Sequence, residues 1–301
     1  MPLTPEQQAE IDSQRATPCQ TLRAVSEGME NHLYVAHPVL DHGLVRVIDY
    51  MGDDAAICQA ARVSYGKGTK SVQNDEGLIR YLMRHWHSTP FEMCEVKFHV
   101  KLPVFVARQW IRHRTANVNE YSGRYSILDR EFYIPAPEHL AAQSSQNHQG
   151  RGEVLQGAEA QRVLDLLRED AMRSYDSYEA MLSQEGQQGL ARELARMNLP
   201  ANIYTQWYWK VDLHNLLHFL RLRADSHAQY EIRAYADIMC DITRDWVPAA
   251  FGAFQDYRMN AVNLSAQAAD ALRRRLAGEV VTQENAGMGA REWREFQAVW
   301  G

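Results

Sequence analysis

The stretch Cys94-Glu95-Val96-Lys97-Phe98-His99-Val100-Lys101-Leu102 alternates apolar and polar side chains with a period of two residues. Successive side chains of a β-strand point to opposite faces of a sheet, so this alternation predicts a strand with one face in the core. Cys94 falls on the apolar face, which favours a buried, structural thiol. The stretch therefore predicts one half-buried strand at residues 94–102.

Further secondary-structure signals lie on both sides of this strand. A second, less regular strand is predicted at residues 203–211 and a third at 45–50. Pro103 suits a first helical turn, and Asp212 suits an N-cap. Helical spacing predicts helices at 54–63, 77–86, 103–114, much of 154–182, and 213–246. Helices outweigh strands and no regular crossover helices separate the strands, so we expect an α+β fold, helix-rich with a small, largely antiparallel sheet.

The chain is long enough for one large domain. Its 301 residues, 46% of them hydrophobic, can bury a substantial core. We expect a single catalytic domain over residues 1–301, with peripheral ends at 1–20 and 279–301. Residues 138–153 are polar, rich in small side chains and without a period, so we expect a mobile surface loop there.

Charge and composition argue against several classes of partner. The net charge of −6 gives no basic footprint, so we expect no nucleic-acid partner. No apolar run approaches the roughly 20 residues that span a bilayer, and the first residues lack the parts of a secretory signal. We therefore expect a cytoplasmic protein without a membrane partner. Free thiols are expected for the widely spaced cysteines, which are Cys19, Cys58, Cys94 and Cys240.

The most polar stretch of the chain follows the predicted helix at 103–114. Residues 112–126 crowd together three arginines, amides, a carboxylate and hydroxyls with hardly an aliphatic side chain. Guanidinium forks suit phosphate and carboxylate oxygens, and Ser122-Gly123 lets the backbone approach a ligand. A solvated helix face is the alternative for an isolated pair of arginines, but this density of polar groups favours an anion pocket for a nucleotide.

Two histidine clusters raise the question of a metal site. His85 and His87 precede Glu92, but their spacing matches no helical ligand pair. His214 and His218 have the spacing of a helical pair, yet no helical glutamate base or third ligand is evident. We therefore predict no metal.

Three motifs together resemble one enzyme family. Arg112-His113-Arg114, followed by Ser122 and Arg124, resembles the R-H-R-x7-S-x-R motif of flavin-dependent thymidylate synthases, although Asn117 stands where that family usually has Ser. Residues 87–93 resemble the family segment H-x-T-P-F-E-H, with Met93 in place of the last His. Residues 222–229 match the family's L-R-A-D-S-H-A-Q.

The resemblance implies a function. Members convert dUMP to dTMP, taking a methylene from methylenetetrahydrofolate and reducing equivalents from NADPH through bound FAD. It also implies a homotetramer whose active sites take residues from several subunits, with an interface role for the aromatic residues Trp207, Tyr208, Trp209 and Tyr230. A non-catalytic flavin- or nucleotide-binding sensor is the main alternative, and an RNA-binding protein using residues 112–114 is a weaker one.

The resemblance also assigns roles to individual residues. It implies catalytic roles for Arg223, which faces the pyrimidine, and for His87. Contacts to dUMP are implied for Gln109, Arg112, Glu120, Ser122, Gly123, Arg124, Arg196 and Arg223. Contacts to FAD are implied for Ser64, Thr89, Arg112, His113, Arg114, Asn119, Glu120, Asp212, His214 and His218. At the last three positions relatives often have Asn, Arg and Asn.

Overall fold

A computed structural model describes residues 4–64, 75–144, 150–182 and 188–301. The chain divides into two compact units, Met1–Met259 and Asn260–Gly301. All predicted site residues belong to the first unit. The prediction of a single catalytic domain is not decided by this division and stays a prediction.

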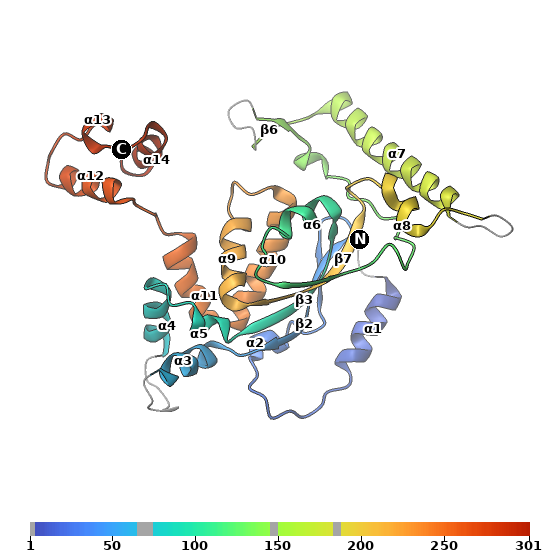
Figure 1. Ribbon diagram of the computed structural model, residues 1–301, viewed down its shortest axis with the longest axis horizontal. Coiled ribbons are helices and arrows are strands. Elements are labelled where there is room, and N and C mark those ends of the chain that lie inside the picture. Colours follow the sequence, from blue (N-terminus) through green and yellow to red (C-terminus); the bar gives the residue numbers. More distant parts are fainter. Residues whose placement is uncertain (1–3, 65–74, 145–149, 183–187) are drawn as a thin grey trace. The chain divides into compact units, whose positions relative to one another are not determined.

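A five-stranded sheet forms the frame of the first unit (Figure 1). Its strands, in spatial order, are β1 (Ala36–Val39), β2 (Gly43–Met51), β3 (Glu95–Pro103), β7 (Tyr204–Asp212) and β4 (Asn117–Glu120). Every pair of neighbours is antiparallel. The predicted α+β fold with a small antiparallel sheet is confirmed, and each predicted strand is found within two residues of its expected ends.

Helices surround this sheet and make up the second unit. In the first unit they are α1 (Pro5–Arg15), α2 (Glu27–Glu30), α3 (Asp54–Val63), α4 (Asp75–Arg84), α5 (Thr89–Glu92), α6 (Val104–Trp110), η1 (Pro137–His139), α7 (Gly157–Met181), α8 (Arg192–Ala195), η2 (Arg196–Asn198), α9 (Leu213–Arg223), α10 (Tyr230–Trp246), α11 (Pro248–Phe254) and the π-helical turn η3 (Gln255–Met259). The second unit holds α12 (Ala266–Leu276), α13 (Gln283–Ala286) and α14 (Ala290–Trp300).

The core lies between the sheet and helices α6, α9 and α10 (Figure 1). Trp110 of α6 is fully buried and contacts rings from both layers. Its ring centroid lies 5.3 Å from Trp209 of β7, 4.5 Å from Phe219 of α9 and 6.0 Å from Tyr235 of α10. The apolar face predicted for β3 supplies the floor of this core, because alternate residues from Val96 to Leu102 are buried. Cys94 is also buried, as predicted.

The predicted helix at 103–114 is shorter than expected. Pro103 ends β3 and serves as the N-cap of α6, which stops at Trp110. The amide of His113 then donates to the Trp110 carbonyl over 2.9 Å, a tight turn in place of another helical turn. Gln109, Arg112 and His113 therefore do not share one helical face. Arg112 and His113 belong instead to the loop that leads into β4.

The predicted helix at 213–246 is also wrong as a single element. It is interrupted between Arg223 and Tyr230, giving α9 and α10. The side chain of Asp225 accepts a hydrogen bond from the His227 amide over 2.8 Å, and its carbonyl accepts from Ala228 over 2.9 Å. Asp side chains compete with the helix in this way and favour turns. Arg223 and His227 consequently do not lie one above the other on a helix.

The region predicted as a mobile loop contains regular structure. Residues Ala141–Gln143 (β5) pair with Arg151–Val154 (β6), so the irregular loop is wrong for these residues. Residues 145–149 of the predicted loop lie outside the described part of the chain. The helix predicted from residue 154 begins only at Gly157, because β6 occupies 151–154.

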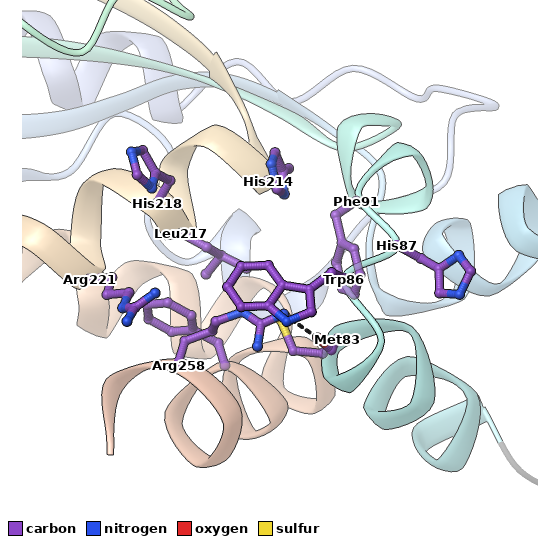
Figure 2. A pocket seen from close by; sticks show the side chains of 10 residues that line it. Met83, Trp86, His87, Phe91, His214, Leu217, His218, Arg221 and Arg258 are labelled. Carbon is purple, nitrogen blue, oxygen red and sulfur yellow. Dashed lines mark hydrogen bonds between the residues drawn. The ribbon is translucent and has the colours of Figure 1, made fainter. Parts of the chain in front are cut away.

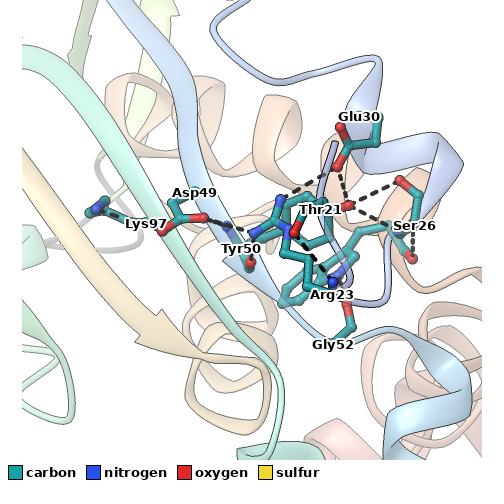
Figure 3. Close-up of polar contacts among 9 residues, drawn as sticks. Thr21, Arg23, Ser26, Glu30, Asp49, Tyr50, Gly52 and Lys97 are labelled. Carbon is teal, nitrogen blue, oxygen red and sulfur yellow. Dashed lines mark hydrogen bonds and ion pairs between the residues drawn. The ribbon is translucent and has the colours of Figure 1, made fainter. Parts of the chain in front are cut away.

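The segment before β1 is anchored to β2 by a polar network around Tyr50 (Figure 3). Arg23 donates to Asp49 over 3.1 Å and to the Tyr50 carbonyl over 2.8 Å, and its guanidinium lies 4.6 Å from the Tyr50 ring centroid. The Tyr50 hydroxyl in turn bonds Glu30 and accepts from the Ser26 amide. Burial and the Glu30 contact together raise the pKa of Tyr50 to about 12, which keeps its hydroxyl a donor.

No helix among the described residues combines the length and the apolar character that a membrane span requires.

A buried carboxylate joins the β5–β6 hairpin to the start of α10. Glu231 has a side chain only 5% exposed, and it accepts hydrogen bonds from Arg151 of β6 and from the Tyr133 hydroxyl at 3.0 Å. Gln229 adds a bond of 2.9 Å. Although burial alone would raise it, the hydrogen bonds lower the pKa of Glu231, chiefly through Arg151. The ion pair with Arg151 therefore stabilises the ionised form of the Glu231 carboxylate against the desolvation penalty of burial.

We expect Arg151→Ala to destabilise the first unit by about 2 to 4 kcal/mol, because it leaves a buried carboxylate without its counter-charge. The matched control is Arg173→Ala, which removes an exposed pair with Asp170 on α7 and should cost less than about 0.5 kcal/mol. Urea unfolding followed by circular dichroism measures both. Equal losses in the two variants would contradict the role given to the buried pair.

Candidate functional site

A cavity of about 350 Å³ opens beside the first half of β7. Three residues predicted to bind dUMP line it: Glu120, Gly123 and Arg196. Gly123 suits this position, because a Cβ there would lie 3.3 Å from Leu128 and 3.4 Å from the Arg196 side chain, which would have to shift by a few tenths of an ångström. Without a Cβ, the backbone leaves this space open at the cavity wall.

Glu120 is oriented by a residue that the sequence did not single out. The hydroxyl of Thr205, a residue of β7 that is 5% exposed, donates to the Glu120 carboxylate over 2.9 Å. Glu120 stands at the end of the edge strand β4, opposite Trp207. A hydrogen bond from a buried hydroxyl fixes the carboxylate at the cavity wall. In the sequence, Thr205 is one residue of an alternating strand, and no pattern distinguishes it from its neighbours.

The other predicted nucleotide residues of this loop lie close by. The Arg124 amide donates to Ser122 Oγ over 3.3 Å, and the Arg124 guanidinium is paired with Glu193 at 3.3 Å. Both charged side chains are about half exposed, so water screens the pair and the interaction is weak. A shallower hollow continues past Asn119 and Glu120 toward Tyr208.

A second pocket lies between the end of α4 and helix α9 (Figure 2). It brings together His87, predicted as catalytic, with His214 and His218, predicted to bind flavin. Figure 2 shows His214 and His218 on α9, across the pocket from Trp86. Aromatic and basic side chains that the sequence analysis did not select complete the lining, among them Trp86, Arg221 and Arg258.

Arg223 and His113 form a direct contact near this second pocket. The Arg223 Nε donates to His113 Nε2 over 3.1 Å, and the His113 ring lies 5.7 Å from His218. Burial lowers the pKa of His113 to about 4, helped by the charges of Arg223 and His218. His113 is therefore neutral near pH 7, and its free ring nitrogen accepts the Arg223 proton donor.

The remaining predicted site residues have these positions. Ser64 is the C-cap of α3 and Thr89 opens α5. Asp212 is the N-cap of α9, as predicted, and both its carboxylate oxygens accept bonds from Asn215. Arg112 and Arg114 are exposed, with no ion pair or hydrogen bond to any other described residue. The Gln109 Oε1 is buried and finds no partner within the described chain.

The predicted residues thus form two groups in one chain. Glu120, Gly123 and Arg196 line the cavity beside β7, whereas His87, His214 and His218 line the second pocket. Arg223 lines neither of these two pockets and contacts His113 instead. The sequence analysis did not select Arg221 or Arg258, because a single arginine in a helix usually indicates an exposed surface residue. Only the fold brings α9 and η3 to one pocket.

Comparison with known proteins identifies the family. The family model described as "Thymidylate synthase complementing protein" matches residues 46–249. The flavin-dependent thymidylate synthase of Ruegeria pomeroyi is 80% identical over 301 residues, which is 100% of both chains. This chain belongs to the flavin-dependent thymidylate synthase family.

Other members and solved structures agree with this assignment. The flavin-dependent thymidylate synthase of Gluconobacter oxydans is 65% identical over 299 residues, covering 99% of this chain and 98% of the relative. The structure of the UMP/dUMP methylase PolB from Streptomyces cacaoi bound with 5-Br dUMP is similar, with a TM-score of 0.65 and 29% identity. The match covers 74% of this chain and 99% of that one. The family resemblance read from the three motifs is confirmed, whereas the roles of single residues stay predictions.

The lowered pKa of His113 predicts a pH dependence of stability. Between pH 6.5 and about 4 the unfolded state binds a proton at His113 that the folded state rejects, so stability falls as the pH falls through this window. At about 1.4 kcal/mol per pKa unit, the loss is on the order of 3 kcal/mol at most. We expect His113→Gln to flatten the dependence of the melting temperature on pH between 6.5 and 4. His85→Gln, at an exposed position, is the control; a slope unchanged by His113→Gln would refute the shift.

Proposed function

We propose that this chain catalyses the reductive methylation of dUMP to dTMP. In this proposal FAD is the bound cofactor, methylenetetrahydrofolate donates the carbon and NADPH is the reductant. The observation that carries the proposal is the cavity beside β7, where Glu120, Gly123 and Arg196 meet in a chain whose relatives bear the name of this reaction. The sensor alternative is not favoured by these relatives.

The cavity offers the groups that a nucleoside monophosphate requires. Arg196 and Arg124 would hold the phosphate, because guanidinium forks donate two bonds to oxyanions. Glu120, held by Thr205, is an acceptor suited to a ribose hydroxyl. The Ser122-Gly123 backbone would approach the nucleotide closely, since no Cβ fills the space at the cavity wall. Gln109 does not line this cavity; its buried carbonyl oxygen has no described partner, and we propose that a donor of the bound nucleotide satisfies it.

Arg223 is the group we propose to polarise the pyrimidine. Its Nε is used in the bond to neutral His113, which fixes the plane of the guanidinium. The two terminal nitrogens make no bond to a described residue and remain able to donate to adjacent acceptors such as a uracil carbonyl and N3. Stabilising negative charge at these atoms raises the nucleophilicity of C5. No protein nucleophile is needed in this scheme.

The second pocket and the nearby loop fit a flavin. The pocket offers His87, His214 and His218 beside apolar side chains, and the exposed Arg112 and Arg114 bring unpaired charge for phosphates. When bound, FAD supplies the redox chemistry of the reaction. Asp212 is already engaged in capping α9, so a flavin contact there must use a remaining lone pair. Ser64, Thr89 and Asn119 complete the proposed set.

We further propose that the active site is completed by neighbouring subunits of a homotetramer. Arg223 contacts His113 and is not part of the cavity that holds Arg196, so a second chain would bring the two groups to one nucleotide. Tyr208 is 43% exposed on the sheet, whereas Trp207 and Trp209 are buried in the core. Only Tyr208 of these three is therefore available to an interface. A cytoplasmic enzyme without nucleic-acid or membrane partners remains part of the proposal.

The direct test is an anaerobic assay of the purified, yellow protein with dUMP, methylenetetrahydrofolate and NADPH. We expect flavin bleaching by NADPH and formation of dTMP in the same reaction. Flavin binding without dTMP in this assay would favour the sensor.

We expect Arg223→Ala to keep bound FAD but to lower turnover by roughly 100- to 1000-fold, because losing one preorganised donor to developing charge costs about that much. Arg223→Lys keeps the charge but loses the fork, so it should be intermediate or as poor. Steady-state kinetics and the flavin absorption spectrum measure the two effects. Normal turnover with FAD bound would transfer the role to another residue.

We expect Thr205→Val to raise KM for dUMP by roughly 5- to 30-fold with kcat little changed, because Glu120 loses a bond worth about 1 to 2 kcal/mol. Thr205→Ser retains the hydroxyl and should restore the KM. A variant with an unchanged KM and an intact fold by circular dichroism would show that Thr205 only fills space.

A further inference from the structure

The second pocket is lined, among the described residues, by basic side chains and by no carboxylate. Of its lining residues, Arg221 and Arg258 carry permanent charge, and no aspartate or glutamate lines it. The chain as a whole has a net charge of −6, so this positive site stands against an acidic background. Asp256, two positions before Arg258, is already paired with Arg80 at 2.5 Å. The pocket therefore has no internal counter-charge among the described residues.

Arg258 is held firmly in place. The π-helical turn η3 presents it to the end of α4, where it donates to the Met83 carbonyl, and it also donates to the Tyr257 carbonyl over 2.9 Å. Its guanidinium lies 3.5 Å from the centroid of the Trp86 ring. Figure 2 shows the Trp86 and Arg258 side chains overlapping among the residues that line the pocket. Burial and the charge of Arg221 both lower the pKa of Arg258, so the two guanidinium groups repel each other.

Trp86 adds a strained aromatic surface to the same place. Its φ of +63° lies in the left-handed region, which bulky residues rarely occupy and which persists only where the surroundings enforce it. The amide of His87, the next residue, donates to the Leu82 carbonyl over 3.0 Å. Trp86 as a whole residue remains 65% exposed. A flat, accessible ring beside two cations suits a ligand that has both an aromatic system and an anionic group.

Arg221 does not hydrogen-bond the described backbone as Arg258 does. It lies on α9 and lines the pocket, yet it makes no hydrogen bond or ion pair with another described residue. Arg258, by contrast, also donates a hydrogen bond to the Met83 carbonyl at the end of α4. A charge that is partly enclosed and not paired within the chain is available to a ligand.

We propose that Arg221 and Arg258 form an anion subsite, next to Trp86, for an oxyanion carried by an aromatic co-substrate other than the flavin. This inference rests on the proposed function, in which two such molecules take part. The oxyanion is either the 2′-phosphate of the reductant or a glutamate carboxylate of the folate. Arg221 lies within residues 46–249 that the family model matches, and Arg258 lies beyond them.

The test compares ligands with and without the oxyanion. Calorimetry on the flavin-loaded protein would measure binding of NADP⁺ against NAD⁺, and of folic acid against pteroic acid, which lacks the glutamate. We expect Arg221→Gln to weaken one charged member, NADP⁺ or folic acid, by roughly 10-fold, as removal of a charge-assisted bond does. The counterpart that lacks the 2′-phosphate or the glutamate should bind as before, and the preference in the unmodified protein should decline as salt is raised.

Three further variants serve as controls for this test. Arg168→Gln removes an exposed arginine of α7, paired with Asp165, and should leave both comparisons unchanged. Arg258→Lys retains the charge and should keep much of the preference, whereas Arg258→Gln also loses the bonds to the end of α4. The subsite is refuted if the folded Arg221→Gln protein prefers NADP⁺ over NAD⁺, and folic acid over pteroic acid, as strongly as the unmodified protein does. It is also refuted if Arg221→Gln loses bound FAD and neither preference changes, because the two arginines would then belong to the flavin site.

The outcome is separable from that of the proposed function. If the unmodified protein forms dTMP while Arg221→Gln leaves both comparisons unchanged, only the subsite fails. If no dTMP forms and yet Arg221→Gln removes a preference for NADP⁺ or folic acid, the anion subsite stands and the reaction is wrong.

Discussion

The packing of Trp110 between the sheet and helices α9 and α10 is the contact on which the rest of the structure depends. Its ring touches Trp207, Trp209, Phe219 and Tyr235, so one side chain ties β7 to both helices. Burying a tryptophan of this size contributes several kcal/mol, and its loss leaves a large cavity. Trp110 is also the last residue of α6. The polar loop that follows is thereby fixed at its start by the centre of the core.

Patterns with one clear period predicted the fold well. The alternation at 94–102 gave the central strand because each apolar residue there is in fact buried, and Asp212 was correctly identified as a helix cap. The errors arose where local polar chemistry competes with helical spacing. Asp225 closes a turn in the middle of a periodic stretch, and the α6 helix stops as soon as Trp110 is buried. Periodicity contains no information about such breaks.

The candidate site was predictable only in part, for a different reason. Motif resemblance selected candidate residues within each block, including Glu120, Arg196 and His218, and their roles stay predictions. It could not select Thr205 or Arg258, because the roles proposed for them depend on contacts between segments far apart in sequence. Thr205 lies 85 residues from the carboxylate that it orients, and the arginine of η3 reaches an α4 carbonyl 175 residues away. Such pairs exist only after folding.

The break between α9 and α10 separates two opposite charges. In an uninterrupted helix, residues 223 and 231 would lie roughly 12 Å apart along one axis, and their side chains would point in directions set by that helix. The turn at Asp225 frees the second segment from this constraint, so Glu231 bonds Arg151 while Arg223 lies beside a neutral imidazole. Arg223 thereby keeps a positive charge that no carboxylate of the described chain neutralises.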